Sequence, residues 1–114
     1  MMQFETESRD GVAVVSLTGD AMGGPDGSAL LDHLHDLRSG GSTNVVVDLS
    51  SVRHMNSSGL GMLIGALTSV RNAGGDLRLA AVGGRVHTLL TVTKLLDVFQ
   101  TYETTDAAVA SFSG

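Results

Sequence analysis

Cysteine is absent from this sequence, which excludes disulfide bonds and thiolate metal sites. The absence fits a reducing compartment, so we expect a cytoplasmic protein. Tryptophan is absent too, and the chain has only one tyrosine, three phenylalanines and one proline. With so few aromatic residues, the core must be built mainly from aliphatic side chains.

Positive charge is also scarce. Seven Lys and Arg residues stand against twelve Asp and Glu residues, which gives a net charge of −5. Binding to phosphates needs clustered Lys and Arg, and these seven are scattered, so nucleic acid is not expected as a partner. No apolar stretch is long enough to cross a bilayer, and Met1–Glu5 lacks the features of a signal peptide. We therefore expect no membrane insertion.

The remaining composition is that of a soluble globule, with 114 residues, 42% hydrophobic and 17% charged. This length predicts one domain, residues 1–114, that buries about two thirds of its unfolded surface. A hairpin followed by strand–helix units predicts an α/β fold with a mixed sheet. Hydrophobic periodicity and turn residues predict strands at 4–8, 12–18, 45–49, 77–82 and 97–100, and helices at 25–39, 57–72, after Gly83-Gly84, and after a cap at Thr105-Asp106.

The stretch Asn56–Met62 is the point that the chain is organised around. A buried strand ending at Leu49 and a polar connection, 50–55, precede it. Asn56 is a good N-cap, because its side-chain oxygen can accept a hydrogen bond from the free amides of the first helical turn. Ser57 and Ser58 then lie in that turn, beside the positive end of the helix dipole.

Three glycines, Gly59, Gly61 and Gly65, interrupt the predicted helix. Each lowers helix stability by about 0.5–1 kcal/mol relative to alanine. Such a cost suggests close packing against either a strand or the backbone of a partner. Close packing over the sheet accounts best for Gly65, and a partner's approach is the alternative for the others.

Catalysis is not expected, although Ser57, His54 and Asp48 suggest a triad. Neither Ser57 nor Ser58 stands in the G-x-S-x-G elbow, and no phosphate-binding P-loop occurs. His33 and His35 point to different faces of a helix, and His87 is expected to be a surface or packing residue. We therefore predict no enzyme activity, no catalytic residue, no metal site and no cofactor.

A serine at a helix start can instead receive a phosphate, because the free amides and the helix dipole tolerate a dianion there. About two negative charges would then appear on a glycine-rich surface and repel a docked partner. The alternative is that Ser57 and Ser58 merely help Asn56 to cap the helix. The residues alone do not decide between these two roles.

The segments Val45–Val52 and Asn56–Gly61 resemble the STAS-domain family, the bacterial anti-sigma-factor antagonists. The resemblance implies a mixed sheet of four or five strands with about four helices packed mainly on one side. It also implies an anti-sigma factor that is a serine kinase as the partner, and a serine phosphatase that reverses the modification. By position the phosphoacceptor is Ser57, and the partner-binding residues are Asp20, Met22, Gly23, Gly24, Asn56, Ser58, Gly59, Gly61, Met62, Gly83 and Gly84.

One residue departs from the family pattern. Members that are phosphorylated usually have aspartate before the acceptor serine, where this chain has Asn56. Asparagine caps a helix as well as aspartate does, so the local structure should be kept. The negative charge is lost, together with any role that it has in phosphotransfer. The alternative function is therefore a scaffold subunit, of a signalling or lipid-transport complex, that docks without being phosphorylated.

Overall fold

The computed structural model describes residues 2–23, 25–41 and 43–113, and for Pro25 and Asp26 it describes the backbone alone. The chain alternates between strands and helices after an initial hairpin. The strands are β1 (Gln3–Arg9), β2 (Val12–Ala21), β3 (Asn44–Met55), β4 (Asp76–Ala80) and β5 (Thr101–Tyr102). The helices are α1 (Pro25–Ser39), α2 (Ser57–Asn72), α3 (Gly84–Val92) and α4 (Thr105–Ala110).

The five strands form one mixed sheet in the order β1-β2-β3-β4-β5. The first pair is antiparallel, and every later pair is parallel. The hairpin turns at Asp10 and Gly11, both with positive φ, as a two-residue turn between right-twisted strands requires. The predicted α/β class and the mixed sheet are confirmed.

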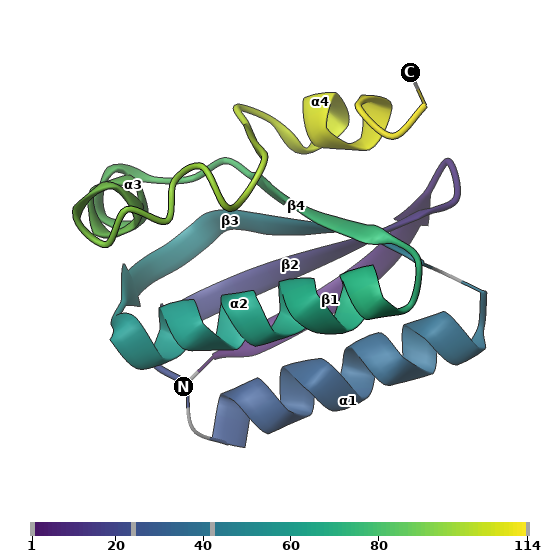
Figure 1. Cartoon of the computed structure of the whole chain (residues 1–114), viewed down its shortest axis with the longest axis horizontal. Helices are drawn as coiled ribbons and strands as arrows, with labels where there is room; N and C mark the ends of the chain where they lie inside the picture. Colours follow the sequence, from purple (N-terminus) through teal and green to yellow (C-terminus); the bar gives the residue numbers. More distant parts are fainter. Residues whose placement is uncertain (1, 24, 42, 114) are drawn as a thin grey trace.

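The helices cover the two faces of the sheet unequally. Figure 1 shows α1 and α2 side by side on one face, and the short α4 on the other. Buried residues of α3, Val86 and Leu90, belong to the same hydrophobic core as those of α1 and α2. The packing is therefore mainly on one side, as the family resemblance implied.

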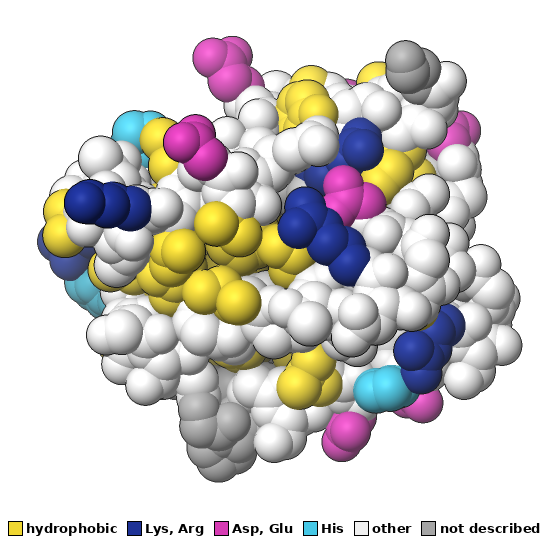
Figure 2. Space-filling model, in the orientation of Figure 1, with side chains coloured by type: hydrophobic (Ala, Val, Ile, Leu, Met, Phe, Trp, Pro, Cys, Tyr) yellow, Lys and Arg dark blue, Asp and Glu magenta, His cyan; other side chains and the backbone are white. Residues whose placement is uncertain are grey.

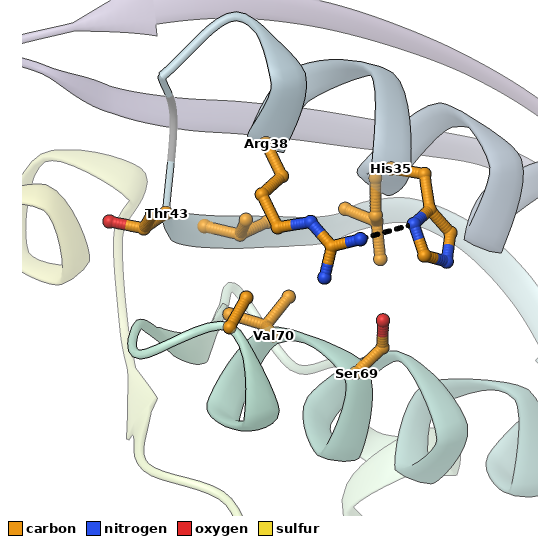
Figure 3. Close-up of a pocket in the computed structure, with 8 residues that line it drawn as sticks. His35, Arg38, Thr43, Ser69 and Val70 are labelled. Carbon is orange, nitrogen blue, oxygen red and sulfur yellow. Dashed lines mark hydrogen bonds between the residues drawn. The ribbon is translucent and has the colours of Figure 1, made fainter.

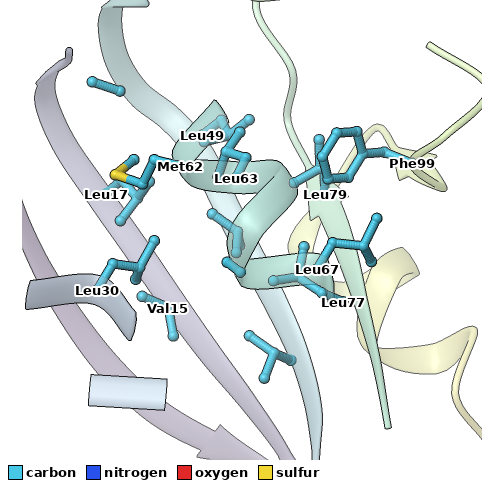
Figure 4. Close-up of a cluster of buried hydrophobic side chains, with 14 of the residues drawn as sticks. Val15, Leu17, Leu30, Leu49, Met62, Leu63, Leu67, Leu77, Leu79 and Phe99 are labelled. Carbon is cyan, nitrogen blue, oxygen red and sulfur yellow. The ribbon is translucent and has the colours of Figure 1, made fainter. Parts of the chain in front are cut away.

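The main core lies between the sheet and these helices. Figure 4 shows Leu30 from α1, Leu63 and Leu67 from α2, and aliphatic side chains from β2, β3 and β4 meeting in one layer. Leu63 is completely buried, so this face of α2 packs into the core. A smaller cluster on the opposite face joins Val14 and Val46 to Val109 of α4. Few aromatic residues contribute to either core, as expected.

Several boundaries differ from the prediction. β3 continues through the segment 50–55, which was expected to be a connection, because it pairs with the end of β2. β2 likewise extends to Ala21, and two register shifts interrupt this pairing. The last strand is Thr101–Tyr102, and the predicted strand at 97–100 is wrong. Thr104, and not Thr105, caps α4, with its hydroxyl accepting a hydrogen bond from the amide of Ala107 at 3.0 Å.

Within the described ranges, none of the helices has the length and the apolar character that spanning a membrane would require.

Candidate functional site

Three strand-to-helix connections meet at one end of the sheet. β2, β3 and β4 are parallel, so their carboxyl ends point the same way, and each is followed by a helix that starts there. The loop before α1, the start of α2 and the turn before α3 therefore lie at one edge, on the left of Figure 1. In open α/β sheets this edge is the usual place for binding.

The N-terminus of α2 has the cap that the sequence predicted. The Oδ1 atom of Asn56 accepts a hydrogen bond from the amide of Gly59 at 2.8 Å, and the backbone of Asn56 is extended. The first turn contains no acidic residue. Asparagine thus satisfies a free amide without adding the negative charge that aspartate would place there.

Ser57 and Ser58 are both exposed in this first turn. They differ in what lies against them. Gly23, in the loop after β2, approaches so closely that a Cβ atom on it would lie 2.8 Å from the backbone of Ser58. Gly23 therefore packs on Ser58, and none of the three atoms nearest to that Cβ position belongs to Ser57.

The glycines of α2 differ in what lies against them. A Cβ atom on Gly59 would overlap with the carbonyl oxygen of Ala21, so Gly59 allows α2 to start directly against the end of β2. At Gly61 and Gly65 a Cβ atom would meet nothing within 4 Å. Close packing against the sheet was expected at Gly65, but the structure places it at Gly59. Nothing inside the described fold requires glycine at Gly61 or Gly65.

The predicted partner-binding residues divide by exposure. Met22, Asn56, Ser58, Gly61, Gly83 and Gly84 are exposed, and Asp20 is half-buried. Gly23, Gly59 and Met62 are buried, and Met62 points into the core beside Leu17 and Leu63 (Figure 4). These three lie beneath the exposed ones, and the partner-binding role of the whole set stays a prediction. Gly24 lies outside the described residues.

A hydrogen bond between β3 and α3 completes the edge, and no local sequence pattern predicts it. Nη1 of Arg85, in the first turn of α3, donates a hydrogen bond to Nδ1 of His54 at 2.9 Å. His54 is also the cross-strand neighbour of Asp20. These contacts place the Gly83-Gly84 turn and the end of β2 at Asp20 close to the start of α2.

The suspected triad is not assembled. Asp48 accepts hydrogen bonds from the amide of Ser50 at 2.9 Å and from the hydroxyl of Ser16 at 3.4 Å. His54 is hydrogen-bonded to Arg85 instead, and among the described side chains no hydrogen bond joins His54 to Asp48. Over the described ranges no group of three His, Asp or Glu residues is arranged to hold a metal ion.

A small cavity lies at the opposite end of the molecule, between the last turns of α1 and α2. Figure 3 shows Arg38 and His35 at its mouth, with Nη2 of Arg38 bonded to Nδ1 of His35 at 2.7 Å. The cavity measures about 10 Å³, which is room for a single water molecule. It lies away from the edge that carries Ser57, and we assign no function to it.

Comparison with known proteins agrees with this fold. An anti-sigma-B factor antagonist of Staphylococcus aureus is 28% identical over 107 residues, which cover 92% of this chain and 96% of the relative. A crystal structure of an anti-sigma factor antagonist from Mycobacterium paratuberculosis superposes with a TM-score of 0.83 at 25% identity, covering 100% of this chain and 96% of that one. The Bacillus cell fate determinant SpoIIAA, in its phosphorylated form, gives a TM-score of 0.73 at 16% identity, with 96% and 99% covered.

The family model for the STAS domain matches residues 3–108, nearly the whole of the described fold. The chain therefore belongs to the STAS domain family.

Proposed function

We propose that this protein is an anti-sigma-factor antagonist, which binds an anti-sigma factor and so releases a sigma factor. One observation carries the proposal: the start of α2 presents exposed Ser57 and Ser58 beside the bare position Gly61, at the edge where three strands end. Relatives of similar length bear this name. Because no side chain projects at Gly61, a partner's backbone can come into direct contact with the helix there.

Phosphorylation of Ser57 is proposed as the switch that ends binding. A phosphate on Ser57 would lie at the positive end of α2, so the helix itself would tolerate the modification. The added charge of about −1.5 to −2 would face outward and oppose a docked partner. The proposed kinase is the anti-sigma factor itself, and a serine phosphatase would restore binding.

A constitutive scaffold is the second candidate, and Asn56 is the residue that favours it. Asn56 caps α2 without a negative charge beside Ser57. A chain of this kind could dock in the same way and never be modified. The two candidates share the binding surface and differ only in the fate of Ser57.

Binding is tested with the purified chain and the anti-sigma factor from the same organism, using titration calorimetry. The wild-type chain should bind the anti-sigma factor. Ser57→Glu should bind at least about tenfold more weakly, because it places an unpaired negative charge at the centre of the interface, where water is excluded. Ser57→Ala is the matched control, since it changes the same serine and adds no charge. Absence of binding by the wild-type chain would remove the proposed function.

Modification is tested separately. The chain is incubated with the anti-sigma factor and ATP, and modified residues are mapped by mass spectrometry. Phosphate on Ser57, and its loss in Ser57→Ala but not in Ser58→Ala, supports the switch. Binding without any phosphate on Ser57 supports the scaffold instead.

A further inference from the structure

Three side chains with N–H donors gather beside the start of α2, and we call Arg53, His54 and Arg85 the basic cluster. Arg53 and His54 are near the carboxyl end of β3, and Arg85 is in the first turn of α3. All three are exposed, and Arg85 and His54 are joined by the 2.9 Å hydrogen bond. Figure 2 shows blue and cyan side chains together over this edge of the molecule, near α3.

The cluster presents donors to solvent. A guanidinium group has N–H donors and no acceptor, so Nδ1 of His54 must be the acceptor in its bond with Arg85. The proton of the neutral imidazole is then on Nε2, which is a further donor. Asp20 is the acidic neighbour, but its nearest approach to Arg53 is 3.9 Å, and Oδ1 of Asp20 is buried with no hydrogen-bond partner among the described residues.

Among the described side chains, no acidic group balances the charge of Arg85. Across the described side chains, the ion pairs involve Arg9, Arg53, Arg71 and Arg78, and none involves Arg85. Its place in the first turn of α3 is also unfavourable, because the positive end of the helix dipole repels a cation. A positive charge held there, in a chain of net charge −5, is therefore better explained by contact with another molecule.

We propose that the basic cluster binds carboxylate side chains of the protein partner that docks at Ser57. This rests on the proposed function, because the cluster lies on the same edge of the sheet. Arg85 offers a fork of donors that matches a carboxylate in two contacts, and Nε2 of His54 offers one more. The partner is thus expected to carry an acidic patch next to the surface that meets Gly61.

Charge reversal tests the proposal, with Arg85→Glu compared against Arg38→Glu. Arg38 is a matched control, because it too is exposed and donates to a histidine, but it lies at the far end of the molecule. Arg85→Glu removes the hydrogen bond to His54 but places an acid at the start of α3, where the dipole favours it, so the new charge should not itself destabilise the helix. Thermal unfolding of each variant verifies this.

Affinity for the anti-sigma factor is measured by calorimetry from about 50 mM to about 500 mM NaCl, a range over which exposed charge pairs become screened. Arg85→Glu should bind at least about tenfold more weakly at low salt, with the difference from wild type shrinking as salt rises, whereas Arg38→Glu should stay within about twofold. Equal affinity of wild type and Arg85→Glu, or equal weakening by both variants, overturns the basic-cluster proposal and leaves the proposed function intact. If the wild-type chain does not bind, the proposed function fails, and this proposal fails with it.

Discussion

Gly59 in α2 packs directly against the carbonyl oxygen of Ala21 at the end of β2. This contact fixes where α2 begins, and with it where the capping residue Asn56 and the two serines stand. Gly61, only two residues later, faces open space. Gly59 is therefore needed for packing within the fold and Gly61 is not, so the same substitution should have opposite effects on stability at the two positions.

Gly59→Ala should lower the free energy of unfolding by about 3 kcal/mol or more, the upper end of the overpacking range, because a backbone atom and not a flexible side chain blocks the new methyl group. Gly61→Ala should raise it by about 0.5–1 kcal/mol, since alanine is the better helix former and the methyl group has room. Urea denaturation monitored by circular dichroism measures both. Similar effects at the two positions would contradict the packing described for Gly59.

Because Gly61 is exposed and nothing packs on it, a side chain added there should raise stability and weaken binding. Gly61→Gln should keep most of the gain in helix stability, because glutamine has a good helix propensity. Its side chain would project into the docked partner, so affinity for the anti-sigma factor should fall at least about tenfold. Thr68→Gln, an exposed change further along α2, is the control for a glutamine that is placed away from the edge. Unchanged affinity in Gly61→Gln would show that no partner docks there.

Gly23 is constrained both by its positive φ and by the contact with Ser58, and a comparison with Gly11 separates the two effects on stability. Both have positive φ, at 79° and 81°, and only Gly23 has the backbone of Ser58 against it. Gly11→Ala should cost about 1–2 kcal/mol of stability from backbone conformation alone. Gly23→Ala should cost about 1–3 kcal/mol more, because the methyl group would push the loop away from α2. Chemical denaturation of the two variants, at matched m-values, measures the difference.

Asn56 offers a test of capping and of charge in one position. Asn56→Ala removes the acceptor for the amide of Gly59 and should destabilise the protein by about 1 kcal/mol. Asn56→Asp keeps the acceptor and adds a charge at the positive end of α2, so it should be as stable as wild type or more stable by about 0.3–1 kcal/mol. Thermal denaturation at low salt is the measurement, and a loss of stability in Asn56→Asp would contradict this account of the cap.

The fold could be predicted largely because its signals are local. The turn at Asp10 and Gly11, the cap at Asn56 and the helix end near Gly74 each depend on the conformational preference of one or two residues. The extension of β3 through 50–55 could not be predicted in this way. It is held by backbone pairing with β2 and carries few apolar side chains, so hydrophobic periodicity gives no sign of it.

The site was predictable in part for the same reason. Exposure of Ser57 and Ser58 followed from their place in a capped first turn. The contact between Gly59 and Ala21 and the bond between Arg85 and His54 join residues that are 38 and 31 positions apart, and only the folded chain brings them together. A glycine in a helical pattern does not show whether a neighbour packs against it, as at Gly59, or whether the fold leaves it open, as at Gly61.

The parallel course of β2, β3 and β4 also has a consequence for engineering. The connections that follow β2, β3 and β4 all lie at one edge of the sheet. They can therefore be exchanged with those of a relative while both hydrophobic clusters are left unchanged. A chimera that carries a relative's three loops on this scaffold should fold as this chain does and change its choice of partner. The loops would then determine which partner is bound, and the sheet with its two hydrophobic clusters would determine the fold.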